Sequence, residues 1–475
     1  MLANVLIDQD VFKRVEDHVT TMYRDLRLPG LALAIVQDGQ VIYQRGFGRA
    51  DTSGRAVTPQ TPFIIGSATK SFTALAIMQL VEAGKIDLDA PVQRYLPWFR
   101  VADLTASASI TVRHLLSHTS GISRYVGRVQ FASNGNATAD QRVRELAAVD
   151  LTHPPGEVFQ YSNSNYVVLG LLIQVVSGQS YQDYLQQHIF APLHLGHTFT
   201  DEMEALRDGA ATGYRWWFGY PFPANVPYPV DQLAAGYLYA SAEDLARYLL
   251  MYMRDGRMDE GFILSEAGIA EMIRAQTRLV SRDGSYGLGW FIEDLQGNTL
   301  IRHGGEVANF RAEMAFLPEH RLGIVMLTNC NNGLVTQLGL DQVALGLIRL
   351  LLGLEPSKSR ISFKQFYFAL DATIVLLFAL PCWSLASLLR GRHRSPQQNA
   401  LNGIRLALPL AWETLLPLAL FKRLPKMVDT PWPMLKRYVP DLSAWLSGAM
   451  GVLVATGVLR IMRILLASIG KERDS

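Results

Sequence analysis

One segment governs the interpretation of this chain: Ile65-Gly66-Ser67-Ala68-Thr69-Lys70-Ser71-Phe72, the start of a helical pattern that runs to Ala83. Residues three apart share one face of a helix, so the amine of Lys70 can reach the hydroxyl of Ser67. A serine attacks once a base removes its proton, and a lysine serves if burial or neighbouring cations lower its pKa. This spacing alone is a weak signal, because it recurs by chance and because a serine here is also typical of a plain helix cap.

Two later segments strengthen the signal. They are Phe159-Gln160-Tyr161-Ser162-Asn163-Ser164-Asn165-Tyr166 and Arg302-His303-Gly304-Gly305-Glu306. In this order and at these separations, the three blocks resemble the serine β-lactamase and penicillin-binding protein superfamily, within it the class C β-lactamase-like branch with its D-amino-acid peptidases and carboxylesterases. The resemblance covers residues 10–352 and extends to flanking segments: Pro29-Gly30, Leu115–Gly121, Pro154-Pro155-Gly156 and Tyr286–Trp290.

The resemblance implies a role for each polar residue of the first two blocks. Ser67 matches the nucleophile that becomes acylated, and Lys70 matches the residue that activates it. Tyr161 matches a phenol that shuttles a proton when neighbouring cations lower its pKa. Asn163 matches an amide that hydrogen-bonds both the substrate and Lys70. The sequence therefore predicts catalysis through an acyl-enzyme at Ser67.

The third block matches an edge strand beside the serine, where Gly304 and Gly305 let a substrate backbone approach. By the same correspondence, the N–H groups of Ser67 and Glu306 form the oxyanion hole. Many β-lactamases have Lys-Thr-Gly or Lys-Ser-Gly where this chain has His303-Gly304-Gly305. Histidine titrates near 6.5 and Gly304 has no hydroxyl, so a permanently charged anchor for a substrate carboxylate is missing.

This departure predicts a weaker preference for penicillin-like acids and a shift towards ester, amide or peptide substrates. A β-lactamase, or a DD-peptidase or D-aminopeptidase acting on cell-wall-type peptides, remains an alternative. A non-turnover penicillin-binding sensor or scaffold is the alternative of another class. His114 and His118 lie in a leucine-rich helical context, which favours hydrogen-bonded structural histidines over catalytic ones.

Strand patterns lie at both ends of the catalytic region. Leu31–Val36 and Val41–Tyr43 flank the turn signal Asp38-Gly39, and Phe310–Leu317 and Leu322–Leu327 form a second pair. Helical patterns fill the interval between these strands. We therefore expect an α/β domain over residues 1–355, with one antiparallel sheet flanked by helices and an additional helical subdomain, as in β-lactamases and transpeptidases.

Charge is distributed unevenly along the chain. From position 358 onward there are 16 basic and 6 acidic residues, against 28 and 36 before it, within totals of 44 and 42. The mildly acidic first part gives no reason to expect nucleic-acid binding. Cys330 and Cys382 are the only cysteines and form no disulfide framework. No His or Cys spacing suggests a metal, so we expect neither metal nor cofactor, and a small-molecule or peptide substrate.

The last part, residues 356–475, is expected to be a membrane region. Phe366–Leu389 and Leu442–Leu459 are apolar stretches long enough to cross a bilayer. Pro409 and Pro417 interrupt a third stretch, 406–421, so two or three spans remain open. With three spans, the two sides of the membrane would receive about equal numbers of Lys and Arg, so the positive-inside rule gives no orientation. We expect a cell-membrane protein whose catalytic part is extracytoplasmic, as the resemblance implies, although residues 1–30 show no secretory signal. The oligomeric state stays open.

Overall fold

The computed structural model describes residues 9–132, 137–258, 261–280, 283–333, 339–356, 362–390 and 399–473. The chain divides into two compact units, Met1–Arg360 and Ile361–Ser475. Each unit is described by itself below.

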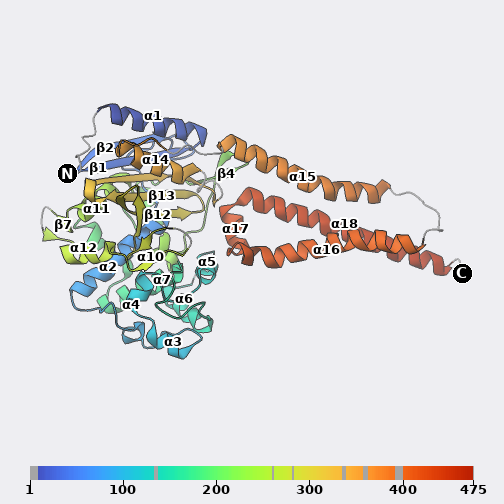
Figure 1. Ribbon diagram of the computed structural model, residues 1–475, viewed down its shortest axis with the longest axis horizontal. Coiled ribbons are helices and arrows are strands. Elements are labelled where there is room, and N and C mark those ends of the chain that lie inside the picture. Colours follow the sequence, from blue (N-terminus) through green and yellow to red (C-terminus); the bar gives the residue numbers. More distant parts are fainter. Residues whose placement is uncertain are drawn as a thin grey trace. The chain divides into compact units, whose positions relative to one another are not determined.

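An eight-stranded antiparallel sheet forms the centre of the first unit (Figure 1). Its strand order is β2-β1-β14-β13-β12-β11-β10-β9. The strands are β1 (Gly30–Gln37), β2 (Gln40–Gly48), β9 (Thr277–Arg278), β10 (Ser285–Tyr286), β11 (Phe291–Leu295), β12 (Asn298–Val307), β13 (Phe310–Leu317) and β14 (Leu322–Thr328). The pairing of β1 with β14 joins the two distant strand regions of the sequence into one sheet. The antiparallel sheet predicted from the sequence is confirmed.

Local turn chemistry explains how the sheet begins. Asp38 and Gly39 both have positive φ, 48° and 82°, as a two-residue hairpin turn between twisted strands requires. The second predicted turn, between β13 and β14, is a short 3₁₀ turn that ends at Arg321 with φ 45°. Every residue of β13 and β14 is buried, so both faces of these central strands are covered.

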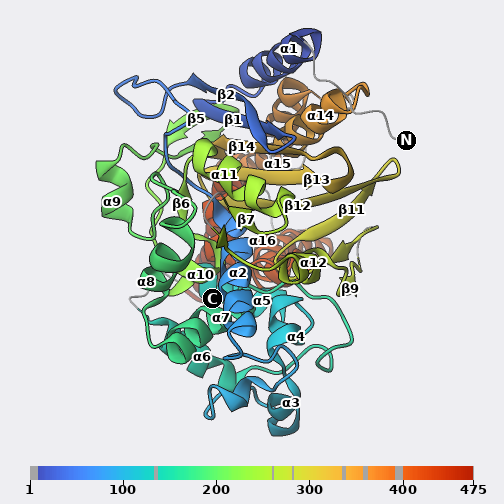
Figure 2. The same ribbon diagram turned by 90° about the vertical axis from the view of Figure 1, so that its left-hand side faces the viewer.

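Helices cover both faces of the sheet (Figures 1 and 2). The helices α1 (Gln9–Asp25) and α14 (Asp341–Leu351) lie on one face, and α11 (Ala242–Met253) and α2 (Thr69–Glu82) lie on the other. Beyond α2 lies the helical subregion, in which α7 (Asn163–Ser177) packs against α2. The remaining helices of the first unit are α3 (Leu104–Ser109), α4 (Val112–Leu116), α5 (Arg124–Ala132), α6 (Ala139–Glu145), α8 (Tyr181–Leu185), α9 (Glu202–Arg207), α10 (Leu233–Gly236) and α12 (Glu266–Ile273).

Short strands complete the first unit. They are β3 (Phe63–Ile64), β4 (Tyr214–Trp217), β5 (Tyr220–Pro223), β6 (Tyr239–Ala240), β7 (Arg257–Met258), β8 (Gly261–Phe262) and β15 (Cys330–Asn331). The pair β3–β6 matters for the site, because β3 leads directly into the Ser67 turn and β6 follows α10. This pairing brings segments that are about 170 residues apart in the chain together at the start of α2.

The second unit is helical. Its elements are α15 (Phe363–Arg390), α16 (Asn399–Met427), α17 (Trp432–Tyr438) and α18 (Pro440–Arg473). Among the described residues, one segment is long and apolar enough to cross a membrane, Pro440–Met462, which contains the predicted span 442–459. The predicted spans 366–389 and 406–421 lie within helices, and their crossing of a membrane stays a prediction.

Candidate active site

Ser67 lies in a tight turn that precedes α2. Residues Gly66–Ala68 form a 3₁₀ turn, and Gly66 has φ 55°, which only glycine adopts without strain. A Cβ on Gly66 would lie 2.4 Å from the backbone nitrogen of Glu306, so β12 approaches this turn closely. Ser67 remains partly exposed, whereas Lys70 on the first turn of α2 is fully buried.

The amine of Lys70 has three polar neighbours. Its Nζ donates to Oδ1 of Asn163 at 2.8 Å and to the carbonyl oxygen of Ala235 at 2.6 Å, and it lies 3.2 Å from Oγ of Ser67. Burial holds the pKa of Lys70 well below its ordinary value, because the ammonium form loses its hydration. A neutral amine has two N–H donors and one lone pair. The two carbonyl oxygens take both donors, which leaves the lone pair for the hydroxyl proton of Ser67.

Tyr161 precedes α7 and stands over the same pair. Its ring centroid lies 4.9 Å from Nζ of Lys70, and its hydroxyl is hydrogen-bonded to Ser67. The expectation that neighbouring cations lower the pKa of Tyr161 is wrong. Burial raises it, and the hydrogen bond with Ser67 and the charge of Arg124 oppose that effect only in part. Tyr161 is therefore a neutral phenol at physiological pH and can donate a proton.

An aromatic cluster surrounds Tyr161. The ring of His118 lies 4.2 Å from that of Tyr161, and Tyr166, Tyr286 and Phe291 complete the cluster. Nδ1 of His118 accepts the backbone N–H of Ser162 at 3.2 Å. His118 is hydrogen-bonded, as the sequence predicts, but its contact with Tyr161 was not anticipated. No helical or strand periodicity could have revealed it, because His118 leaves its helix with φ 58°.

The third block lies on β12, beside the serine turn. Among the described strands, β11 pairs with β12 only as far as Arg302, so residues 303–307 form an edge. A Cβ on Gly305 would lie 1.6 Å from the carbonyl oxygen of Ile65. Gly305 is thus required by the chain's own packing against the turn, and not only by the approach of a substrate. The backbone nitrogens of Ser67 and Glu306, the expected oxyanion-hole donors, flank this contact.

His303 is buried within the site, with 1% of its surface exposed. Nδ1 lies 2.7 Å from its neighbour's carbonyl oxygen, that of Gly304, and Nε2 lies 3.2 Å from the hydroxyl of Tyr286. Since the carbonyl can only accept, Nδ1 carries the proton and Nε2 accepts from Tyr286. Burial, aided by the charge of Lys70, lowers the pKa of His303 to about 3. The expected titration near 6.5 is therefore wrong, and His303 is neutral throughout the physiological range.

The space beside Gly304 is already filled. A Cβ at this position would lie 2.6 Å from Nη1 of Arg311 and 2.7 Å from Oε2 of Glu313. A Cβ projects from the face of a sheet, so these contacts explain why no side chain fits here; that a substrate backbone approaches Gly304 along the open edge of β12 stays a prediction. Arg311 donates to the carbonyl oxygen of Gly305 at 2.9 Å and forms ion pairs with Glu313 and Asp341. Glu306 accepts from Asn331, and burial raises the pKa of its carboxyl group.

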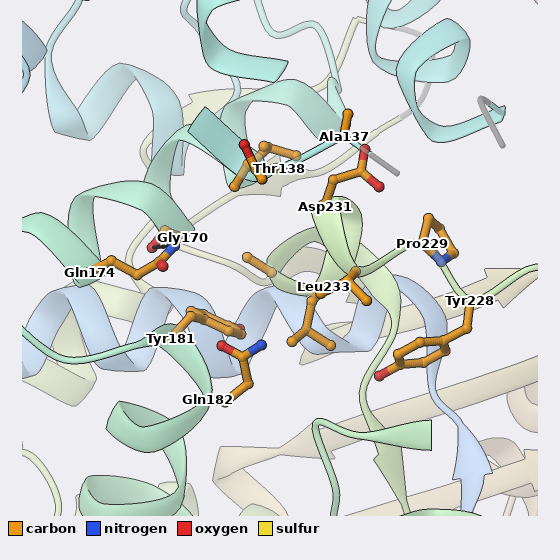
Figure 3. A pocket seen from close by; sticks show the side chains of 14 residues that line it. Ala137, Thr138, Gly170, Gln174, Tyr181, Gln182, Tyr228, Pro229, Asp231 and Leu233 are labelled. Carbon is orange, nitrogen blue, oxygen red and sulfur yellow. Dashed lines mark hydrogen bonds between the residues drawn. The ribbon is translucent and has the colours of Figure 1, made fainter. Parts of the chain in front are cut away.

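A cavity of about 440 Å³ lies close to the site but outside it (Figure 3). Tyr181, Leu233 and Ala234 line it, whereas neither Ser67 nor Lys70 does. It shares α10 with the site, because the carbonyl oxygen of Ala234 accepts from Thr73 while that of Ala235 accepts from Lys70. Among the described residues, no group of three or more His, Cys, Asp or Glu could hold a metal ion.

A family model described as Beta-lactamase matches residues 12–346, which includes all three blocks. This chain belongs to the beta-lactamase family. A curated relative, Penicillin-binding protein 4 of Amycolatopsis lactamdurans, is 32% identical over 331 residues, 66% of this chain and 82% of the relative. Protein flp of Staphylococcus aureus (strain N315) is 29% identical over 313 residues; the match takes 66% of this chain and spans 61% of that protein's length.

Solved structures are similar to this family member as well. The octameric penicillin-binding protein homologue from Pyrococcus abyssi has 30% identity and a TM-score of 0.64, over 73% of this chain and 79% of its own. EstCE1, described as a hydrolase with promiscuous acyltransferase activity, has 26% identity and a TM-score of 0.60, over 68% and 95%. The β-lactamase and penicillin-binding protein fold is thereby confirmed, and the superfamily is that of serine hydrolases.

Proposed function

We propose that this chain is a membrane-tethered serine hydrolase that acts on ester, amide or peptide substrates through an acyl-enzyme at Ser67. The observation that carries the proposal is the environment of Lys70. A buried amine of lowered pKa stands 3.2 Å from the serine hydroxyl, and its two donors are already engaged. That arrangement fits a general base.

The proposed reaction has two halves. In acylation, Oγ of Ser67 bonds to the substrate carbonyl carbon and its proton passes to Lys70. The bond to the leaving group breaks as the phenol of Tyr161 gives the leaving group a proton, and the lysine proton restores the phenol. In deacylation, water attacks the acyl-enzyme, releases the acid and restores the serine hydroxyl. The N–H groups of Ser67 and Glu306 would stabilise the oxyanion in both halves.

The state of His303 supports esters, amides or peptides over penicillin-like acids. A neutral imidazole whose two nitrogens are both engaged supplies no positive charge to a carboxylate held by β12. The resemblance to EstCE1 favours an esterase or acyl-transfer activity, whereas the resemblance to Penicillin-binding protein 4 keeps cell-wall-type peptides and β-lactams as the second candidate. Efficient hydrolysis of nitrocefin or penicillin would contradict the first candidate.

Wild type and Ser67→Ala, profiled over p-nitrophenyl esters, D-amino-acid amides, D-Ala-D-Ala peptides and β-lactams, test the proposal. Hydrolysis by the wild type that disappears in a folded Ser67→Ala variant is the expected result. A stable adduct at Ser67 on intact-mass analysis, without product release, would instead indicate a penicillin-binding sensor or scaffold. Hydrolysis that survives the substitution would exclude Ser67 as the nucleophile.

We further propose that residues 1–355 form the catalytic domain and 356–475 the membrane region. The candidate span Pro440–Met462 supports this, because only 22% of its apolar window is buried, unlike the core helix of a soluble protein. Large apolar side chains such as Phe368, Trp383 and Leu415 are also exposed on α15 and α16. Protease treatment of intact cells tests the proposed extracytoplasmic location: cleavage of the catalytic domain supports it, and full protection contradicts it.

A further inference from the structure

Helix α5 is fixed against the segment that holds Tyr161 and Asn163. The hydroxyl of Ser162, the residue between them, donates to the carbonyl oxygen of Ser123 at 3.1 Å, immediately before α5 begins. One turn later, a Cβ on Gly127 would lie 2.7 Å from the backbone nitrogen of Asn163. Two contacts with consecutive residues, 162 and 163, therefore set the position of the first turn of α5.

The other end of α5 reaches Gly236 of α10, which in turn lies next to the serine turn. A Cβ on Gly236 would lie 3.3 Å from the ring of Phe131 and 3.5 Å from the carbonyl carbon of Gly66. The positions 124, 127 and 131 follow the spacing of one helix face. Arg124 therefore shares the face of α5 that runs along the site, at the end next to Tyr161.

The guanidinium of Arg124 is exposed, and no ion pair or hydrogen bond joins it to another residue in the described parts of the chain. Its charge acts on the site, because it lowers the pKa of the Tyr161 phenol against the larger effect of burial. Arg124 is also the first residue of α5, where the helix dipole disfavours a cation. The first turn of α5 contains no acidic residue to offset it. An anion bound to the guanidinium would offset the unfavourable interaction of this cation with the helix dipole.

The usual alternative, a cation at position 303 of β12, is absent, and the neighbouring cation Arg302 is paired with Glu293 and Glu313. His303 is neutral and buried, and the space beside Gly304 is occupied by Arg311 and Glu313.

We propose that Arg124 binds a carboxylate on the leaving group of the substrate. That the carboxylate belongs to the leaving group, and not to the acyl group, follows from the proposed function, on which this inference rests. If Tyr161 gives its proton to the leaving group, the leaving group lies next to Tyr161 and therefore near Arg124. The favoured substrates are open-chain esters or amides whose leaving alcohol or amine carries a free carboxylate, as the terminal amino acid of a peptide does. A penicillin, whose carboxylate would be held at β12, is not among them.

Two esters of matched shape test the proposal: 3-carboxybenzyl acetate and 3-carbamoylbenzyl acetate, with the released alcohol measured by chromatography. Arg124→Gln in the full chain should lower kcat/KM for the carboxylate ester about tenfold, mainly through KM, and leave the carbamoyl ester nearly unchanged. Arg124→Lys should keep part of the preference for the carboxylate ester over the carbamoyl ester. Arg207→Gln on α9, which also removes an exposed arginine, is the control and should change neither ester selectively.

Added salt should reduce the preference of the wild type for the carboxylate ester, because an exposed charge is screened. The melting temperature of Arg124→Gln should equal or exceed that of the wild type, since the substitution removes a cation from a helix N-terminus. Equal losses on both esters, or no loss on either, would overturn the proposal. Hydrolysis of both esters by Ser67→Ala would instead overturn the proposed function, so the two failures are distinguishable.

Discussion

At the scale of single residues, the site depends on groups whose charge is suppressed by burial. Burial lowers the pKa of Lys70 and so favours its neutral amine, and burial also keeps Tyr161 protonated and His303 neutral. The arrangement therefore contains a neutral base and a neutral acid, both close to Ser67. Such a pair acts at neutral pH without a cation being deprotonated at each turnover.

The pH dependence of hydrolysis follows from these states. As pH falls through the lowered pKa of Lys70, the amine gains a proton and can no longer accept the serine proton, so kcat/KM should fall on the acid side. Because the pKa of Tyr161 is raised, no loss from its ionisation should occur up to pH 10. Values of kcat/KM measured from pH 4 to 10 with a neutral ester test both the expected loss at acid pH and the absence of a loss at alkaline pH. A kcat/KM that keeps rising up to pH 10 without levelling off would show that Lys70 has an ordinary pKa.

His118 should act by positioning, because Nδ1 accepts the N–H of Ser162 and its ring lies against Tyr161. His118→Phe keeps a ring but removes the acceptor, and an unsatisfied buried N–H costs about 1–3 kcal/mol. We expect kcat to fall about tenfold with little change in KM, in a steady-state assay with a neutral ester. His118→Asn, which retains a short acceptor, should recover part of the loss. An unchanged kcat in His118→Phe would show that Tyr161 needs no such support.

At the scale of elements, the approach of β12 to the turn before α2 sets the width of the site. A Cβ on Gly305 meets the carbonyl oxygen of Ile65 at 1.6 Å, a backbone atom that cannot move aside alone. Gly305→Ala should therefore lower the free energy of unfolding by about 1–3 kcal/mol and abolish most activity. Gly196→Ala is the matched control, because a Cβ there has no neighbour within 4 Å. Chemical denaturation and ester hydrolysis measure the two effects, and equal stability of both variants would contradict this packing.

In the second unit, α16 and α18 are joined by a buried ion pair. Arg460 donates to both carboxylate oxygens of Glu413, at 2.9 and 2.8 Å, and 1% of Glu413 is exposed. Glu413→Gln would leave the charge of Arg460 uncompensated and should destabilise this unit by about 3–5 kcal/mol. Replacing both residues by Met should cost much less. Thermal unfolding of the detergent-solubilised chain compares the two variants, and equal losses would indicate that the pair contributes no specific stability.

At the scale of the whole molecule, the two units differ in the surface they present. Described residues of the helical unit expose large apolar side chains along α15, α16 and α18, among them Phe368, Leu418 and Val458. Contiguous exposure of this kind marks contact with lipid or with another protein. We expect the chain to stay in the membrane fraction after high-salt and alkaline washes and to be released only by detergent. Recovery in the wash supernatant would contradict the proposed membrane region.

The sequence by itself determined the parts of this protein that depend on local pattern. The hairpin at Asp38-Gly39, the two-ended strand pattern and the i, i+3 spacing of Ser67 and Lys70 all follow from backbone preferences of neighbouring residues. The confirmed sheet therefore needed no knowledge of tertiary contacts. The resemblance of the three blocks to the family also predicted that Tyr161 and the third block lie beside Ser67.

Only the tertiary structure decided which of these groups carry charge. Desolvation depends on segments far apart in the chain: α10 and α7 enclose Lys70, and Tyr286 with its neighbours encloses His303. No spacing in the sequence records that enclosure. For the same reason neither His118 nor Arg124 was predicted as part of the site. His118 contacts Tyr161 and Ser162, and the charge of Arg124 acts on Tyr161, only because separate segments of the chain pack together. Burial explains why His303 supplies no charged anchor on β12, and we propose that a cation on α5, Arg124, takes that role.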